Sequence, residues 1–172
     1  LPDAQYYPMS YPAVENAQMQ WIVANRVARN IVYVSAVGDS TNDNNSAQWA
    51  NVNTAFAYLE DPLTTGLPSG IPYGITLGNH DQTPSGTARS GSDEGATTTL
   101  YNQTFGQSRF CPSGNCRSYF GENYTFGGAF PASMDNHYEL FNADGMEFIA
   151  FNLEWDQADN STRQAVLAWM RN

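Results

Sequence analysis

Two apolar runs in this chain each end in glycine followed by a side chain that could bind a metal ion. The run at 71–77 leads into Gly-Asn-His-Asp at 78–81, and the run at 31–37 leads into Gly-Asp at 38–39. Continuous apolar runs of this length are typical of buried β-strands. Ligands of open α/β sheets gather at the carboxyl ends of strands, where glycine lets the backbone turn sharply. The sequence therefore predicts a ligand site where these two strands end.

Helices are predicted before and between these strands. Residues 15–29 follow helical spacing, with an apolar face made of Ala17, Trp21, Ala24 and Ala28. A second helix is expected to begin with Ser46 as its N-cap and to end before Asp61-Pro62, because proline stops a helix. Its apolar face consists of Trp49, Val52, Phe56 and Leu59. The strand, helix, strand order predicts a parallel pair of strands.

The second half of the chain changes to β-rich patterns. A polar loop at 82–95 and a short helix near 97–105 precede apolar runs at 119–120, 124–126, 138–141 and 146–151, with a hairpin turn signal at 142–145. A capping box at 161–164 starts a C-terminal helix with an apolar face of Val166, Trp169 and Met170. The aromatic residues of this half are expected to pack in the core: Tyr119, Phe120, Phe148 and Phe151. Together these patterns predict one α/β domain with a mixed β-sheet flanked by helices.

The composition excludes several classes of partner. Seventeen acidic residues oppose seven arginines, there is no lysine, and the formal net charge is −10. Such a surface repels nucleic acid and anionic membranes, because binding to phosphates needs clustered cations. It also repels phosphate-containing substrates unless bound metal ions reverse the charge locally.

Four sequons and two cysteines favour a secreted protein. The sequons begin at Asn44, Asn102, Asn123 and Asn160, although a chain rich in Asn, Ser and Thr produces some sequons by chance. Cys111 and Cys116 could close a small disulfide loop, which suits an oxidising compartment; the alternative is half of a zinc site. The chain starts at Leu1 without methionine, so we expect it to be truncated at both ends.

Three motifs in order, Leu-Pro-Asp-Ala-Gln-Tyr-Tyr at 1–7, Val-Gly-Asp at 37–39 and Leu-Gly-Asn-His-Asp at 77–81, resemble the calcineurin-like metallophosphoesterases. Asn-Leu-Glu-Trp at 152–155 and the following helix resemble the continuation of that domain. The resemblance covers nearly the whole chain and implies a single partial domain over 1–172 with a layered metallophosphoesterase-like fold.

The resemblance also implies a role for each motif residue. In this family two divalent cations, Fe, Zn or Mn, clamp a phosphoryl group and activate a water molecule. Asp39 would bridge the two ions, Asp3 would bind the first and Asn79 the second. His80 would protonate the leaving oxygen, and Asp81 would orient its ring. These assignments predict a secreted hydrolase acting on a phosphate monoester or diester.

The chain also departs from the family pattern. Gln5 stands where the family usually has a histidine ligand, which lowers the expected affinity or shifts it towards harder ions. Asn42 replaces a usual acidic residue, and the family's later histidine motifs are absent from this chain. His137 is the one other histidine, and we interpret it as an ordinary polar residue of a loop or strand edge.

Two interpretations follow for function. In the first, the chain is part of a metal-dependent phosphoesterase, and this segment alone is impaired because two carboxylates and two amides hold two dications weakly. In the second, the chain binds no metal and is a glycosylated extracellular protein that self-associates through exposed sheet edges.

Overall fold

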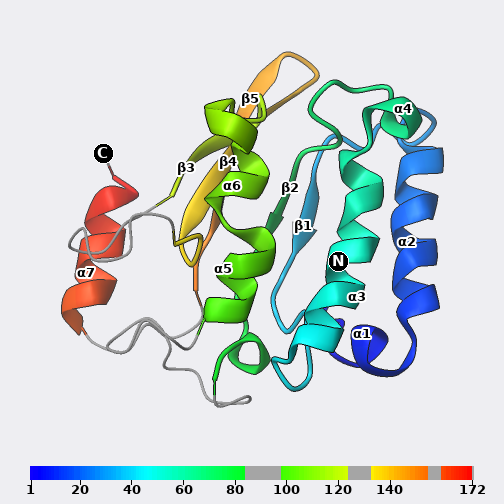
Figure 1. Ribbon diagram of the computed structural model, residues 1–172. Coiled ribbons are helices and arrows are strands. Elements are labelled where there is room, and N and C mark those ends of the chain that lie inside the picture. Colours follow the sequence, from blue (N-terminus) through cyan, green and yellow to red (C-terminus); the bar gives the residue numbers. More distant parts are fainter. Residues whose placement is uncertain (84–97, 124–132, 155–159, 172) are drawn as a thin grey trace.

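The computed structural model describes residues 1–83, 98–123, 133–154 and 160–171. In Figure 1 the parallel strands β1 and β2 lie between α2 and α3 on one side and the sheet β3–β5 on the other, with α7 beyond that sheet. The order along the chain is α1 (Tyr6–Ser10), α2 (Pro12–Asn25), β1 (Val34–Ala36), α3 (Ser46–Glu60), α4 (Pro62–Thr65), β2 (Tyr73–Ile75), η1 (Asn79–Asp81), α5 (Thr99–Phe105), α6 (Gln107–Phe110), η2 (Pro112–Gly114), β3 (Phe120–Asn123), β4 (His137–Ala143), β5 (Met146–Asn152) and α7 (Asn160–Trp169).

The predicted strand, helix, strand unit is confirmed. Strands β1 and β2 pair in parallel with Val34 opposite Tyr73 and Ala36 opposite Ile75, and α3 connects them. Both strands are shorter than the apolar runs that predicted them. Residues 1–4 continue the arrangement, because the Val37 amide donates to the carbonyl of Leu1 at 3.3 Å. The start of the chain therefore lies along the carboxyl end of β1.

Helix α3 buries the face that its periodicity predicts. Its four predicted core residues, Trp49, Val52, Phe56 and Leu59, are all at most 2% exposed. The helix ends at Glu60, as the following Asp-Pro predicts. The N-cap is Asn45 and not Ser46, since the Asn45 side chain accepts a hydrogen bond from the Gln48 amide.

Helix α2 forms where expected but buries a different face. It ends at Asn25, and its buried residues are Glu15 and Met19. The predicted apolar face is exposed instead; Trp21 is 50% exposed, and the Arg29 guanidinium lies 5.3 Å from its ring centre. Packing against α1 and α3 selects the Met19 face. That face also holds a buried glutamate, so hydrophobic spacing alone pointed to the wrong side.

The second half forms a separate antiparallel sheet in the order β3, β4, β5, so the single mixed sheet that we expected is wrong for the described residues. The predicted hairpin is confirmed: β4 pairs with β5, and Asp144 and Gly145 in the turn both have positive φ angles. That geometry suits Asp-Gly in a two-residue turn. Phe148 is 39% exposed, contrary to the expected core position, because it lies near the turn of this hairpin, where the two strands extend away from the rest of the fold.

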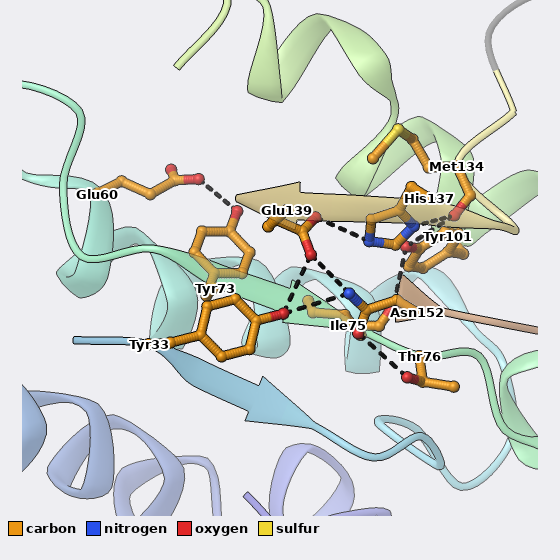
Figure 2. A network of polar contacts seen from close by, with 10 residues as sticks. All are labelled: Tyr33, Glu60, Tyr73, Ile75, Thr76, Tyr101, Met134, His137, Glu139 and Asn152. Atoms are coloured by element: carbon orange, nitrogen blue, oxygen red, sulfur yellow. Dashed lines mark hydrogen bonds and ion pairs between the residues drawn. The ribbon is translucent and has the colours of Figure 1, made fainter. Parts of the chain in front are cut away.

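The two faces of this sheet contact different parts of the molecule. Tyr138 and Phe151 pack against Trp169 of α7, with ring centres 5.7 and 5.8 Å from that of Trp169. The alternate residues of β4, His137 and Glu139, face the parallel strands (Figure 2). The antiparallel sheet is thus sandwiched between the β1–β2 pair and α7.

Several further predictions can be compared with the described residues. The helix expected near 97–105 is α5, and the C-terminal helix is α7. Cys111 and Cys116 form a disulfide, so the zinc half-site alternative is wrong. Most of the predicted 82–95 loop and the run at 124–126 lie outside the described residues. Within the described part of the chain, no helix combines the length and apolar character needed to cross a bilayer.

The packing of Phe56 yields a stability prediction. Its ring centre lies 5.2 Å from that of Tyr73 and 5.4 Å from that of Phe105. We expect Phe56→Ala to lower the free energy of unfolding by about 3–5 kcal/mol, because it opens a cavity in the core. Denaturant titration measures this loss, with Phe148→Ala at the half-exposed ring as the matched control. Equal losses in the two variants would contradict this assignment of the core.

Candidate functional site

The ends of β1 and β2 meet at one open cavity of about 440 Å³. Asp3, Asp39 and Asn79 all line it, so the predicted convergence of these three side chains is present. The wall opposite the strand ends comes from Leu153 and Glu154, which follow β5. The cavity therefore draws on three strand ends and on the start of the chain.

The backbone at the end of β1 is bent tightly to present Asp39. Gly38 and Asp39 have φ angles of +97° and +50°, and this left-handed region is unusual for an aspartate. Gly78 lies directly against this bend, because a Cβ atom on Gly78 would strike the side chain and amide of Asp39. Glycine at the end of β2 is thus required by the close approach of the two loops.

Asp81 holds these two loops together. Its carboxylate is fully buried and accepts hydrogen bonds from the amides of Ser40 at 3.0 Å, Thr41 at 2.8 Å and Gly78 at 3.1 Å. The Thr41 hydroxyl adds a fourth at 3.1 Å. Burial raises the pKa of Asp81 to about 6, although all four donors act in the opposite direction. Asp81 is therefore ionised at neutral pH and anchors the loop that carries Asp39.

The predicted pairing of Asp81 with the ring of His80 is wrong. The carboxylate oxygens of Asp81 are committed to the loop donors, and the Nδ1 atom of His80 instead lies 2.8 Å from the carbonyl oxygen of Asn42. This contact favours the tautomer with its proton on Nδ1. The backbone amide of His80 donates to Oδ1 of Asp39 at 2.9 Å, so His80 also positions that carboxylate. His80 is not among the residues that line the cavity.

Gln5 connects the two carboxylates. Its amide nitrogen Nε2 lies 3.4 Å from Oδ2 of Asp3 and 3.4 Å from Oδ2 of Asp39. The backbone amide of Gln5 also donates to Oδ1 of Asp3 at 3.1 Å. Two like charges are thus held near one neutral amide, which is an arrangement that a cation would stabilise. Rotation of the amide would present its oxygen in place of its nitrogen.

The donor chemistry suits a hard cation. Asp3, Asp39, Gln5 and Asn79 offer carboxylate and amide oxygens, the ligands that Mg²⁺, Mn²⁺ and Ca²⁺ prefer. No three His, Cys, Asp or Glu side chains among the described residues lie close enough together to hold a metal ion. These ligand types match hard divalent cations more closely than the Fe or Zn ions that the resemblance implied.

Glu154 is a cavity residue to which the sequence interpretation gave no role. It is 6% exposed, and its backbone amide donates to Oδ1 of Asn136 at 3.1 Å. The signal was present in the sequence, because Glu154 follows an apolar run as Asp39 does. Two carboxylates from the first quarter of the chain, those of Asp3 and Asp39, and one from near its end, that of Glu154, therefore line the same cavity.

The sequons differ in their surroundings. Asn44 is 7% exposed, and its amide binds both Trp49 Nε1 at 2.7 Å and the hydroxyl of Thr83 at 2.8 Å. The amide of Asn102 donates to Asp135 at 2.7 Å and accepts from the Met134 amide. A glycan would be attached to Nδ2, the atom that donates to Thr83 in Asn44 and to Asp135 in Asn102, so it would compete with these two contacts. Glycosylation of Asn44 and Asn102 stays a prediction. The side chains of Asn123 and Asn160 lie outside the described set.

The anchoring role of Asp81 can be tested. Asp81→Asn replaces an accepting oxygen with an amino group that would face backbone N–H donors. We expect it to lower the free energy of unfolding by about 2–5 kcal/mol, because buried donors lose their acceptor. Thermal or denaturant unfolding measures the change, and Asp144→Asn in the exposed hairpin turn is the control for charge. A variant as stable as the Asp144→Asn control would show that Asp81 does not anchor the loops.

No protein-family profile and no solved structure matches the chain significantly. The uncharacterized protein YvnB of Bacillus subtilis (strain 168) is similar, with 29% identity over 171 residues. The match covers 99% of this chain and 11% of YvnB. The chain thus spans about a tenth of the length of this curated relative.

Proposed function

We propose that this chain is the cation-binding part of a secreted phosphoesterase that hydrolyses phosphate monoesters or diesters. The observation that carries the proposal is the gathering of Asp3, Asp39 and Asn79 around one cavity at the ends of two parallel strands. The Cys111–Cys116 disulfide supports an oxidising location. The activity of the whole protein is part of the proposal, because further residues could complete the site.

The residues of the site would divide the work as follows. Asp3, Asp39, Gln5 and Asn79 would hold the cation, and a bound cation would supply Lewis acidity towards a phosphoryl oxygen. Asp81 fixes the loop of Asp39, so this carboxylate is positioned before any ligand arrives. His80 positions Asp39 through its backbone amide, and because His80 is not among the residues that line the cavity we assign no proton-transfer step to its ring.

Electrostatics make the cation necessary for this function. The chain carries a formal net charge of −10, and Asp3, Asp39 and Glu154 line the cavity. A phosphate ester approaching this surface is repelled. A divalent cation held by these carboxylates would reverse the local field and would give the phosphate a binding partner.

Metal titration tests the site. We expect the chain to bind Mn²⁺ at one site with a dissociation constant of about 10⁻⁴–10⁻³ M, because few charged ligands surround it. Asp39→Asn should weaken binding at least tenfold, and Asp144→Asn should not. The loss of free Mn²⁺ signal in electron paramagnetic resonance measures both. Equal affinities in the two variants would rule out Asp39 as a ligand.

Hydrolysis by the isolated chain is expected to be negligible. Two carboxylates and two amides provide too few charges to hold a pair of dications against water. Release of nitrophenol from nitrophenyl phosphate and bis(nitrophenyl) phosphate with added Mn²⁺ measures this. Metal-dependent turnover that disappears in Asp39→Asn would contradict the prediction and would establish a complete active site in this segment.

Self-association is a second candidate function. It is favoured by the four exposed apolar residues of the β4–β5 hairpin, Leu140, Met146, Phe148 and Ile149, which are 39–58% exposed. Strand β5 is also the outer strand of its sheet among the described residues. If this surface associates, Ile149→Glu should reduce the sedimenting mass, whereas Val27→Glu at an exposed site on another part of the fold should not. A monomeric parent chain at all concentrations would exclude this function.

A further inference from the structure

A fully buried histidine and glutamate face each other between the two sheets. His137 and Glu139 are both 0% exposed, and Nε2 of His137 lies 3.3 Å from Oε1 of Glu139. The two residues occupy alternate positions on β4, the central strand of its sheet, and therefore point to the same side. His137 is thus a core residue, and its interpretation as an ordinary polar loop or edge residue is wrong. Figure 2 shows both side chains pointing into the space above β2.

The hydrogen bonds of His137 determine its tautomer. Nδ1 lies 2.7 Å from the carbonyl oxygen of Met134, which can only accept, so Nδ1 carries a proton. In the neutral ring Nε2 is then an acceptor. Neither Nε2 of His137 nor Oε1 of Glu139 has another hydrogen-bond partner. One proton between these two atoms would satisfy both, and without it two buried acceptors would face each other.

The other oxygen of Glu139 is already occupied. Oε2 accepts from the Tyr33 hydroxyl at 3.0 Å and from Nδ2 of Asn152 at 2.6 Å. The remaining proton position on Glu139 is therefore Oε1, the atom that faces His137. A carboxylic acid at Glu139 can donate to Nε2 while it accepts at Oε2, so every polar atom of the pair has a partner.

Burial favours the neutral form of this pair over an ion pair. It raises the pKa of Glu139 to about 8 and lowers the pKa of His137 to about 4. The ionisable groups that face Glu139 from neighbouring segments are the phenols of Tyr33, Tyr101 and Tyr119, and burial raises the pKa of each. All of these groups are uncharged at neutral pH.

Two arginines, Arg109 and Arg117, form ion pairs with a different carboxylate, that of Glu60. The guanidinium groups of Arg109 and Arg117 lie 2.7 and 3.5 Å from Oε1 of Glu60. The hydroxyl of Tyr73 donates to the same carboxylate oxygen at 2.6 Å. Among the described residues, no cation therefore neutralises Glu139 if it ionises, apart from His137 itself.

The pair lies where the two sheets meet. Asn152 links Glu139 to the parallel strands, because its Oδ1 accepts from the Thr76 hydroxyl at 3.2 Å. A Cβ atom on Gly74 of β2 would collide with Asn152, Tyr33 and Glu139 together. Thr76 also lines the cavity described above. The packing of the sheets thus depends on a complete set of hydrogen bonds around Glu139.

We infer that Glu139 and His137 share a single proton as a neutral acid and imidazole, and that this proton makes the junction between the two sheets sensitive to pH. Loss of the proton leaves a buried carboxylate facing a ring nitrogen, and gain of a second proton creates a buried imidazolium facing an acid. Either change loosens the contact between β4 and β2. The inference does not depend on metal binding or catalysis.

The direction of the pH effect follows from the two pKa values. For Glu139 the folded value of about 8 lies above the ordinary value of 4.5, so its contribution to stability is complete at low pH and is lost as the pH rises to 8. For His137 the folded value of about 4 lies below the ordinary 6.5, so its contribution is lost as the pH falls. Between pH 4.5 and 6.5 the loss of stability with rising pH that Glu139 causes is cancelled by the gain that His137 causes. As the pH rises from 6.5 to 8, the contribution of the pair to the free energy of unfolding therefore falls.

Glu139→Gln tests the inference, because glutamine copies the protonated acid: it donates through Nε2 and accepts through Oε1. We expect the variant to fold and to lose less thermal stability than the parent chain between pH 6.5 and 8, by about 4–8 °C in Tm. The difference between the two proteins isolates Glu139 from other buried groups such as Glu15, whose pKa burial raises to about 7. Glu147→Gln, at an exposed position on β5, is the control and should follow the parent.

Nitrogen NMR of the parent chain gives an independent result. With two histidines in the sequence, the His80→Asn variant assigns the signals. We expect His137 to be neutral at pH 6 with its proton on Nδ1, so its two ring nitrogens resonate far apart. Two closely spaced signals at pH 6 would identify an imidazolium and overturn the inference. A Glu139→Gln variant with the pH profile of the parent would also overturn it.

Discussion

One buried carboxylate determines how the candidate site is built. Asp81 binds the loop after β1 through Ser40 and Thr41 and the loop after β2 through Gly78. A buried anion is stable only when donors surround it, so this arrangement of the two loops is favoured over others in the folded chain. Asp39 stands on the first loop and Asn79 on the second. The separation of the two predicted ligands therefore depends on a residue that binds no ligand itself.

The residues at the strand ends are acidic, as the chain as a whole is. Acidic side chains from distant segments line one cavity in a protein without lysine, and a neutral amide, that of Gln5, lies between two of them. Oxygen donors of this kind select among cations by the hardness and charge of the ion more than by coordination geometry. These donors agree with the cation site that we propose, and their few charges explain why the proposed binding is weak.

Sequence patterns predicted the elements whose signals are local and redundant. Helix α3 combines an uninterrupted apolar face with a proline stop, whereas α2 has a buried Glu15 on the face that packs, so its orientation depended on tertiary contacts. The site was predictable to the extent that side chains build it. The partner of His80 is a backbone carbonyl, which has no sequence signature. The burial of His137 did have one, because Glu139 lies two positions away on the same face of a strand.

The absence of a Cβ atom at Gly74 limits which residues this position can accept. Three polar groups from separate segments, those of Tyr33, Glu139 and Asn152, occupy the space that a side chain on this strand would need. Displacing β2 by one residue would bring a larger neighbour into that space. A side chain at position 74 would therefore force Tyr33, Glu139 and Asn152 to move from their present hydrogen bonds. Polar contacts here select the arrangement of the sheets, while apolar contacts elsewhere provide cohesion.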